Sequence, residues 1–236
     1  MRNYFLIIRK LNLKCKFILG STFIVIGRPD KLPVNENSIC NPTTIYGTNR
    51  LASEYYCKIF NQLYDLDILI FRITNSFGPR EQSLTPTKNA INFLIHHAFK
   101  GKEITIYNQG KFFRDVIYID DVISALNVLM NKGKKGESYN ISASNEIDVL
   151  TIIKKILSIM NKDISNYELS EDRPGHDFRY SMSSKKISNE LGWIMKTSFE
   201  EGLEKTIQWY LDNPDILNEI SSTVLDSTPW KSSNKL

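Results

Sequence analysis

The sequence predicts an α/β protein, because continuous apolar segments alternate with segments of helical periodicity. Two apolar runs, at 16–19 and 67–72, have the composition of strands that are buried on both faces of a parallel sheet. A helix is expected between them from Tyr46 onward, as the crossover between two parallel strands requires. The 236 residues allow one large or two small domains, at roughly 150 residues per domain.

Composition excludes few classes of function. The net charge is +4 and 42% of the residues are hydrophobic, which is typical of a globular protein. The basic residues are scattered and give no positive support for nucleic-acid binding. The longest apolar stretch, 17–27, is about half the ~20 residues that a membrane span needs, so we expect no membrane segment. Three cysteines without metal-ligand spacing favour a reduced, cytoplasmic setting.

The first part of the chain has clear helix and loop signals. Residues 2–11 carry apolar side chains at helical spacing, and 28–45 contain three prolines that indicate a loop. In the helix from Tyr46, Glu54 and Lys58 are spaced for an i,i+4 ion pair. Four apolar residues of this helix share one face, a pattern that is more often core than interface: Leu51, Tyr55, Ile59 and Leu63.

The alternation of strands and helices continues to about residue 213. Asp120 and Ser183 are candidate helix caps, and Ser198 with Glu201 forms a capping box. Four more strands are expected, at 103–107, 113–119, 137–142 and 167–169. Five more helices are expected, at 89–100, 120–130, 146–160, 183–192 and 198–213. The last twenty residues are polar and aperiodic, which predicts a frayed tail.

The segment Tyr46-Gly-Thr-Asn-Arg50 carries the first chemical signal. Positions i and i+4 of a helix share a face, so the phenol and the guanidinium are neighbours. A neighbouring cation favours the phenolate, which a tyrosine needs in order to act as a base near neutral pH. By itself the pattern is weak, because an ion-pairing surface helix would contain the same residues.

Two further features make the pattern specific. Thr22 follows the first strand, and the carboxyl ends of parallel strands face the ligand crevice of an open α/β sheet. The segments 17–27 and 46–50, with the intervening loop to Pro42, resemble the extended short-chain dehydrogenase/reductase family, which includes nucleotide-sugar epimerases and dehydratases. The catalytic Ser/Thr, Tyr and Lys of that family match Thr22, Tyr46 and Arg50, with arginine in place of lysine. The resemblance implies NAD as cofactor, held in part by Tyr46 and Arg50.

Three downstream segments extend the resemblance. The segments 71–79, 113–121 and 171–177 resemble the family's substrate-binding motifs, and through them Asn75, Arg114 and Arg173 are implied to bind a nucleoside diphosphate sugar. Arginine suits a diphosphate because its planar fork donates two parallel hydrogen bonds. The alternative for each arginine is a structural salt bridge, such as Arg114 with a neighbouring aspartate.

The residues after Thr22 bear on the type of reaction. The resemblance implies that 4,6-dehydratases carry an Asp-Glu acid/base pair there, whereas this chain has Phe23 and Ile24. Neither side chain can move a proton, so a 4-epimerase-like reaction is favoured over water elimination. A dehydratase relative, or a non-catalytic nucleotide-sugar-binding protein, remains the alternative. The three histidines lack cysteine partners, so we expect no metal site.

The resemblance also implies a domain organisation. We expect a partial Rossmann-like, doubly wound parallel sheet plus a small α/β substrate-binding domain. The first would occupy 1–80, with parts of 103–142 returning to it, and the second 81–213, followed by a tail at 214–236. No Gly-x-Gly-x-x-Gly is present, which suggests a truncated chain, an internal methionine taken as the start, or a second polypeptide. The family's dimers imply a homodimer through the helix that carries Tyr46.

Overall fold

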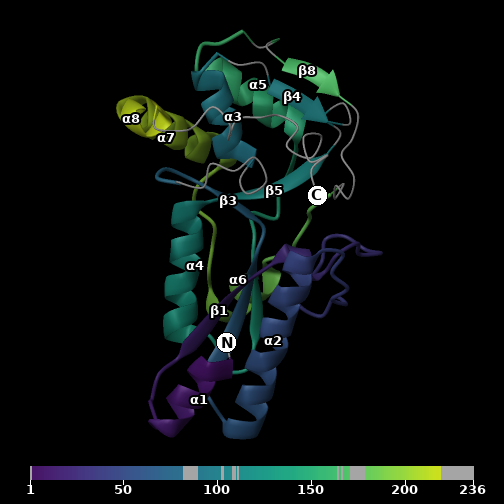
Figure 1. Cartoon of the computed structure of the whole chain (residues 1–236), viewed down its shortest axis with the longest axis vertical. Coiled ribbons are helices and arrows are strands. Elements are labelled where there is room, and N and C mark those ends of the chain that lie inside the picture. Colours follow the sequence, from purple (N-terminus) through teal and green to yellow (C-terminus); the bar gives the residue numbers. More distant parts are fainter. Residues whose placement is uncertain are drawn as a thin grey trace, which may run out of the picture. The chain divides into compact units, whose positions relative to one another are not determined.

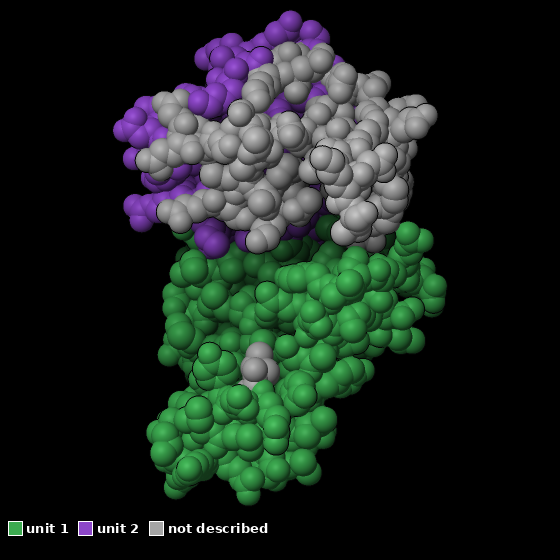
Figure 2. All heavy atoms as spheres, in the orientation of Figure 1, with its two compact units in different colours: residues 1–74, 120–146, 180–196 green, residues 75–119, 147–179, 197–236 purple. Residues whose placement is uncertain are grey.

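Figure 1 shows the computed structural model of the chain, in which helices alternate with parallel strands as the sequence predicts. The structure describes residues 2–81, 90–101, 104–107, 110, 112–163, 165, 167–170 and 179–218. The chain forms two compact units, coloured separately in Figure 2. Unit 1 comprises 1–74, 120–146 and 180–196, and unit 2 comprises 75–119, 147–179 and 197–236. Within the described residues, no helix is both long enough and apolar enough to cross a membrane.

Unit 1 is built around a three-stranded parallel sheet in the order β1-β2-β6. Its strands are β1 (Phe17–Thr22), β2 (Ile68–Ile73) and β6 (Ser138–Ile141). Its helices are α1 (Arg2–Lys10), the short 3-10 helix η1 (Phe23–Val25), α2 (Ile45–Tyr64), α4 (Ile119–Lys132) and α6 (Lys185–Leu191). In Figure 1, α2 and α4 cover opposite faces of this sheet. This two-sided cover explains why β1 and β2 both begin with continuous apolar runs.

The register of unit 1 aligns the carboxyl ends of β1 and β2. Thr22 pairs with Ile73, and Ser21 pairs with Arg72. Arg72 pairs in turn with Asn140 of β6. Paired residues of parallel strands share a face, so Ser21, Arg72 and Asn140 form a polar row across the sheet.

The face of α2 that packs on the sheet differs from the predicted one. Its buried residues are Gly47, Glu54, Cys57 and Phe60. Three residues of the predicted apolar stripe are instead exposed, namely Tyr55 (53%), Ile59 (47%) and Leu63 (67%). The expectation that this stripe is core was therefore wrong for these three residues, whereas Leu51 packs against a buried cluster. The face that meets the sheet carries small residues and a paired carboxylate, which an apolar pattern does not reveal.

Aromatic side chains pack α1 against the rest of unit 1. Phe5 is fully buried, with its ring centroid 4.9 Å from that of Phe17 and 5.1 Å from that of Phe60. Ile68 and Ile70 of β2 complete this cluster. Burial also raises the pKa of Cys57, inside the same cluster, to about 12, with the nearby Glu54 acting in the same direction.

The described residues of unit 2 form two sheets. One has the order β3-β5-β7 and the other pairs β4 with β8 in parallel. The strands are β3 (Asn75–Phe77), β4 (Ile104–Tyr107), β5 (Phe113–Tyr118), β7 (Glu146–Asp148) and β8 (Tyr167–Ser170). The helices are α3 (Ala90–Phe99), α5 (Val149–Ile159), α7 (Phe199–Asp212) and α8 (Pro214–Asn218). Apolar residues of α3, α5, α7 and the strands form one shared core.

Several predicted element boundaries need correction. Asp120 lies within the first turn of α4 rather than at its cap. The helix predicted from Glu146 begins at Val149, because residues 146–148 form β7 and the Asp148 carboxylate accepts a hydrogen bond from the Thr151 amide. Ser184, not Ser183, is the N-cap of α6. The capping box at Ser198 is confirmed on one side, since its hydroxyl accepts a hydrogen bond from the Glu201 amide at 3.1 Å.

The core of unit 2 contains a buried histidine. His96 is 2% exposed, and its ring packs edge-on against Tyr210 with centroids 5.5 Å apart. Its Nε2 has no hydrogen-bond partner within the described part of the chain. Burial, followed by the charges of His97 and Lys100, lowers the pKa of His96 from 6.5 to about 4.

Acid should therefore destabilise unit 2 through His96. The unfolded state takes up the proton near pH 6.5 and the folded state near pH 4, so the contribution is present above pH 6.5 and is lost as the pH falls between these values. The full difference is roughly 3 kcal/mol. Urea denaturation at pH 7.0 and pH 4.0 would measure it, and His96→Phe should lose less stability between the two pH values. An equal acid loss in both proteins would contradict this assignment.

Candidate active site at the carboxyl ends of β1 and β2

Thr22 is the last residue of β1 and caps the turn that follows. Its Oγ1 accepts a hydrogen bond from the Ile24 amide at 3.3 Å, which makes Thr22 the N-cap of η1. The cap fixes the oxygen at the carboxyl end of the sheet. A hydroxyl that accepts one hydrogen bond still has its own proton to donate.

Tyr46 and Arg50 lie one turn apart at the start of α2. The Arg50 Cζ is 5.2 Å from the centroid of the Tyr46 ring, a cation–π contact. The Arg50 guanidinium also donates to the Gly20 carbonyl oxygen of β1 at 3.3 Å. Tyr46 is 51% exposed and so accessible to a ligand. Arg50 therefore contacts both the ring of Tyr46 and the strand that ends in Thr22.

Gly47 allows α2 to begin directly against η1. A Cβ at this position would lie 2.9 Å from the Ile24 carbonyl oxygen and 2.9 Å from the Pro42 Cβ. The Thr44 hydroxyl, which accepts a hydrogen bond from the Gly47 amide at 3.0 Å, starts the helix at this contact. This close approach places the start of α2, which carries Tyr46 and Arg50, against the turn that Thr22 caps.

Glu54, on the same helix as Tyr46 and Arg50, forms a buried ion pair with Arg72 of β2. Glu54 is 0% exposed and Arg72 is 2% exposed. Arg72 Nε donates to Glu54 Oε1 at 2.9 Å, and its terminal nitrogen donates to Oε2 at 2.7 Å. Ser21 Oγ also donates to Oε1, at 2.6 Å. Burial alone would lower the pKa of Arg72, but the hydrogen bonds and charge of Glu54 raise it above its usual range.

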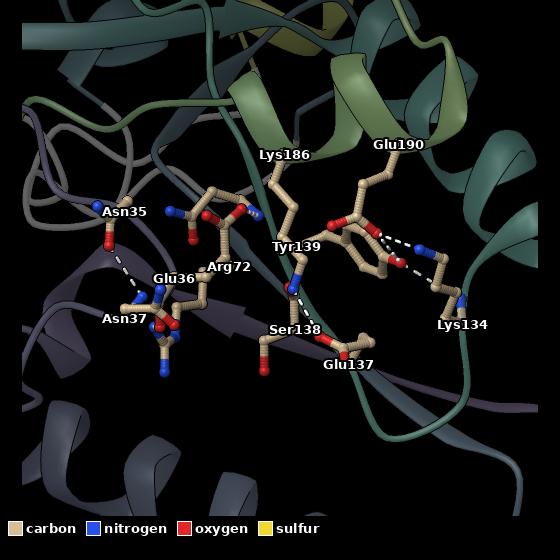
Figure 3. A network of polar contacts seen from close by, with 11 residues as sticks. Asn35, Glu36, Asn37, Arg72, Lys134, Glu137, Ser138, Tyr139, Lys186 and Glu190 are labelled. Carbon is tan, nitrogen blue, oxygen red and sulfur yellow. Dashed lines mark hydrogen bonds and ion pairs between the residues drawn. The ribbon is translucent and has the colours of Figure 1, made fainter.

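Arg72 also holds the loop between η1 and α2. It donates to the Glu36 carbonyl oxygen at 3.4 Å and to the Cys40 Sγ at 3.3 Å. The Glu36 carboxylate accepts a hydrogen bond from the backbone N–H of Asn140 in β6 at 2.8 Å. Figure 3 shows Glu36 beside Arg72 in this network. Burial raises the pKa of Cys40, although the nearby Arg72 acts in the opposite direction.

The predicted substrate residues Asn75 and Arg114 lie in unit 2. Asn75 pairs with Val116 across β3 and β5, and Arg114 is two residues before Val116 on the same strand. Asn75 and Arg114 therefore lie on one face of this sheet, because side chains alternate along a strand. Arg114 is 8% exposed, donates to the Phe113 carbonyl oxygen at 2.9 Å, and has its Cζ 5.4 Å from the Phe112 ring centroid. The predicted residue Arg173 lies outside the described residues.

A family profile described as GDP-mannose 4,6 dehydratase matches residues 3–206. The chain belongs to this family. Its relatives are dTDP-glucose 4,6-dehydratases, and its structural neighbours include a dehydratase in complex with NAD and a UDP-glucose 4-epimerase, so membership of the extended short-chain dehydrogenase/reductase group is also shown.

Curated relatives match the chain over part of their length. The dTDP-glucose 4,6-dehydratase of Shigella flexneri is 35% identical over 206 residues, covering 84% of this chain and 56% of the relative. A dTDP-glucose 4,6-dehydratase of Escherichia coli K12 is 33% identical over 210 residues, covering 86% and 57%. The chain thus spans about half the length of these relatives.

Solved structures of enzymes with two different activities resemble this chain to a similar degree. A dTDP-glucose 4,6-dehydratase from Bacillus anthracis, in complex with NAD, has a TM-score of 0.81 and 28% identity, covering 90% of this chain and 66% of the other. A UDP-glucose 4-epimerase from Thermotoga maritima, with UDP-glucose, has a TM-score of 0.83 and 28% identity, covering 89% and 67%. The α/β class with a Rossmann-like sheet is therefore confirmed.

Sequence reasoning misassigned one residue of this site. Glu54 was expected to pair with Lys58 on the helix surface, but it is buried and pairs with Arg72. Two signals could have found the pair. Glu54 is one turn beyond Arg50 on the same face of the helix, and Arg72 interrupts an otherwise apolar buried strand. A cation at such a position requires a buried anion.

Removing one partner of the Glu54–Arg72 pair should reduce the free energy of unfolding far more than removing both partners. Arg72→Met leaves the Glu54 carboxylate buried without its cation, which should reduce the free energy of unfolding by about 3–5 kcal/mol. Arg72→Met combined with Glu54→Leu should lose much less. As a control, Lys155→Met breaks the exposed pair with Glu200 and should change stability by at most about 1 kcal/mol. Urea denaturation measures all three, and equal losses in the single and double variants would count against the ion pair.

Proposed function

We propose that this protein is an NAD-dependent, nucleotide-sugar 4-epimerase-like enzyme, which oxidises the sugar at C4 and then reduces it again. The observation that carries the proposal is the arrangement of Thr22, Tyr46 and Arg50, which join a hydroxyl, an accessible phenol and a cation at one end of the sheet. The nicotinamide end of NAD would lie against these residues, because the Tyr46 side chain is half exposed and therefore accessible.

Each of the three side chains has a distinct role in this proposal. Tyr46, as phenolate, removes the proton from the sugar 4-hydroxyl. Thr22 donates a hydrogen bond to the same oxygen and stabilises it as it becomes a carbonyl. Arg50 stabilises the phenolate by its charge. Bound NAD supplies the hydride acceptor, which the protein itself lacks.

The residues after Thr22 favour epimerisation over dehydration. Phe23 is 2% exposed, and its ring centroid is 4.9 Å from that of Tyr180, so it belongs to the core. Ile24 has an alkyl side chain, which cannot act as an acid or a base. The second candidate is a dTDP-glucose 4,6-dehydratase, which the 35% identity with the relative of that name favours. The third is a protein that binds nucleotide sugars without catalysis.

We further propose a nucleoside diphosphate sugar as substrate, with Asn75, Arg114 and Arg173 as its contacts. Support comes from Asn75 and Arg114 sharing one face of a sheet and from neighbours whose structures hold such ligands, including UDP-glucose. We also propose a cytoplasmic location, because three cysteines without metal-ligand spacing favour a reducing compartment.

Tyr46→Phe tests the role of the phenol. Removal of the proton acceptor should reduce turnover of UDP-glucose or dTDP-glucose, in the presence of NAD, by at least about 100-fold. Tyr55→Phe is the matched control, because Tyr55 lies on the same helix and is 53% exposed; it should retain activity. Product analysis gives the reaction type: a 4-epimer supports the proposal, whereas a 4-keto-6-deoxy sugar would establish the dehydratase. Sugar-nucleotide binding without NAD and without turnover would favour the non-catalytic alternative.

We also propose a homodimer through the exposed faces of α1 and α2. Tyr4, Ile7 and Leu11 of α1 are 67%, 52% and 61% exposed, and Tyr55, Ile59 and Leu63 of α2 are exposed as well. The two helices are neighbours, since Arg9 lies 4.2 Å from the centroid of the Tyr64 ring. So many apolar side chains on adjacent helices are typical of a protein–protein contact.

A charge in this patch should separate the dimer. Ile59→Glu buries a carboxylate in the proposed contact and should convert dimers to monomers in sedimentation-velocity experiments. Met130→Glu, at a 52% exposed position of α4, should leave the association unchanged. A parent protein that sediments as a monomer at all concentrations would refute the proposal.

A further inference from the structure

The carboxylate of Glu54 connects the two segments that carry the proposed catalytic side chains. It accepts a hydrogen bond from Ser21, the residue before Thr22 on β1. It also lies on α2 one turn beyond Arg50, about 6 Å along the helix axis. Among the described residues of unit 1, no other side chain of α2 forms hydrogen bonds to both β1 and β2.

The contacts of Glu54 are directional. Its two oxygens receive three hydrogen bonds, one from Ser21 and two from Arg72. The two strands are paired in register at these very residues, so the donors have a fixed spacing. A carboxylate that meets a fixed row of donors permits one axial position of the helix, whereas apolar contacts alone tolerate small sliding.

Stability by itself does not account for a buried pair of this kind. Desolvation of two charges offsets much of their attraction, and well-packed apolar residues often replace such pairs without loss. The pair instead lies at the point where the helix with Tyr46 and Arg50 meets the strand with Thr22. Arg72 extends the same connection to the loop before α2 through the Glu36 carbonyl and the Cys40 sulfur.

We propose that Glu54 and Arg72 are positioning residues, which set the axial position of α2 against β1 so that Tyr46 and Arg50 lie at the working distance from Thr22. This inference rests on the proposed function. The pair touches neither substrate nor cofactor, and it acts through Ser21 on one side and through the helix on the other. A displacement of about 1 Å in such a site can cost up to about 100-fold in rate.

The decisive variant is the double substitution Glu54→Leu with Arg72→Met, which removes both charges and leaves none buried alone. We expect it to fold, with turnover reduced by about 10-fold to 100-fold and with KM for the sugar nucleotide nearly unchanged. Lys134→Met with Glu190→Gln removes an exposed ion pair of the same unit and serves as the matched control. Unchanged turnover in the folded Glu54/Arg72 double variant would overturn the proposal.

A readout that needs no turnover separates this inference from the proposed function. Labelling the tyrosine Cζ atoms with carbon-13 gives one signal for Tyr46, assigned by its loss in Tyr46→Phe. The signal should shift in the Glu54/Arg72 double variant and stay unchanged in the Lys134/Glu190 control. If the parent protein shows no turnover, the proposed function fails, and the Tyr46 signal alone decides whether the pair positions this residue.

Ser21→Ala keeps the proposal testable if the double variant does not fold. This substitution removes the hydrogen bond from β1 to Glu54 and leaves the ion pair intact. It should reduce turnover and shift the Tyr46 signal in the same direction as the double variant, but less. The absence of both effects in a folded Ser21→Ala protein would refute the positioning role.

Discussion

The buried carboxylate of Glu54 is the constraint on which the candidate site depends. Its desolvation is offset only when Arg72 and Ser21 donate to it, and these donors lie on two neighbouring strands. The requirement fixes how α2 lies on the sheet. It thereby leaves Tyr46 and Arg50 at the carboxyl end of β1, beside the residue that caps η1.

Close packing completes this arrangement. Gly47 gives α2 room to start against the Ile24 carbonyl, and Arg50 hydrogen-bonds to the Gly20 carbonyl on the adjacent strand. The Glu54–Arg72 ion pair, Gly47 and Arg50 all contribute to the packing of α2 against the sheet and η1. A single substitution among them therefore affects the position of the whole first turn of α2, not one side chain.

In unit 2, the register of β3 and β5 places Asn75 and Arg114 on the same face of a sheet. Asn75 and Arg114 are far apart in sequence, yet the pairing of Asn75 with Val116 puts both on one face of the β3-β5-β7 sheet. His96 lies buried in the core of the same unit. The two residues proposed to bind substrate thus lie on a sheet distinct from the one that carries Thr22.

The sequence determined the features that depend on neighbours along the chain. The alternation of strands and helices, the adjacency of Tyr46 and Arg50 one turn apart, and the cap at Ser198 all follow from local spacing. The same local reasoning failed where partners are distant. It assigned Glu54 to Lys58 and put the stripe containing Tyr55 and Ile59 in the core, because helical spacing reveals two faces but not which one the sheet covers. Only the tertiary structure decided this, since burying Glu54 is favourable solely where Arg72, on another element, donates to it.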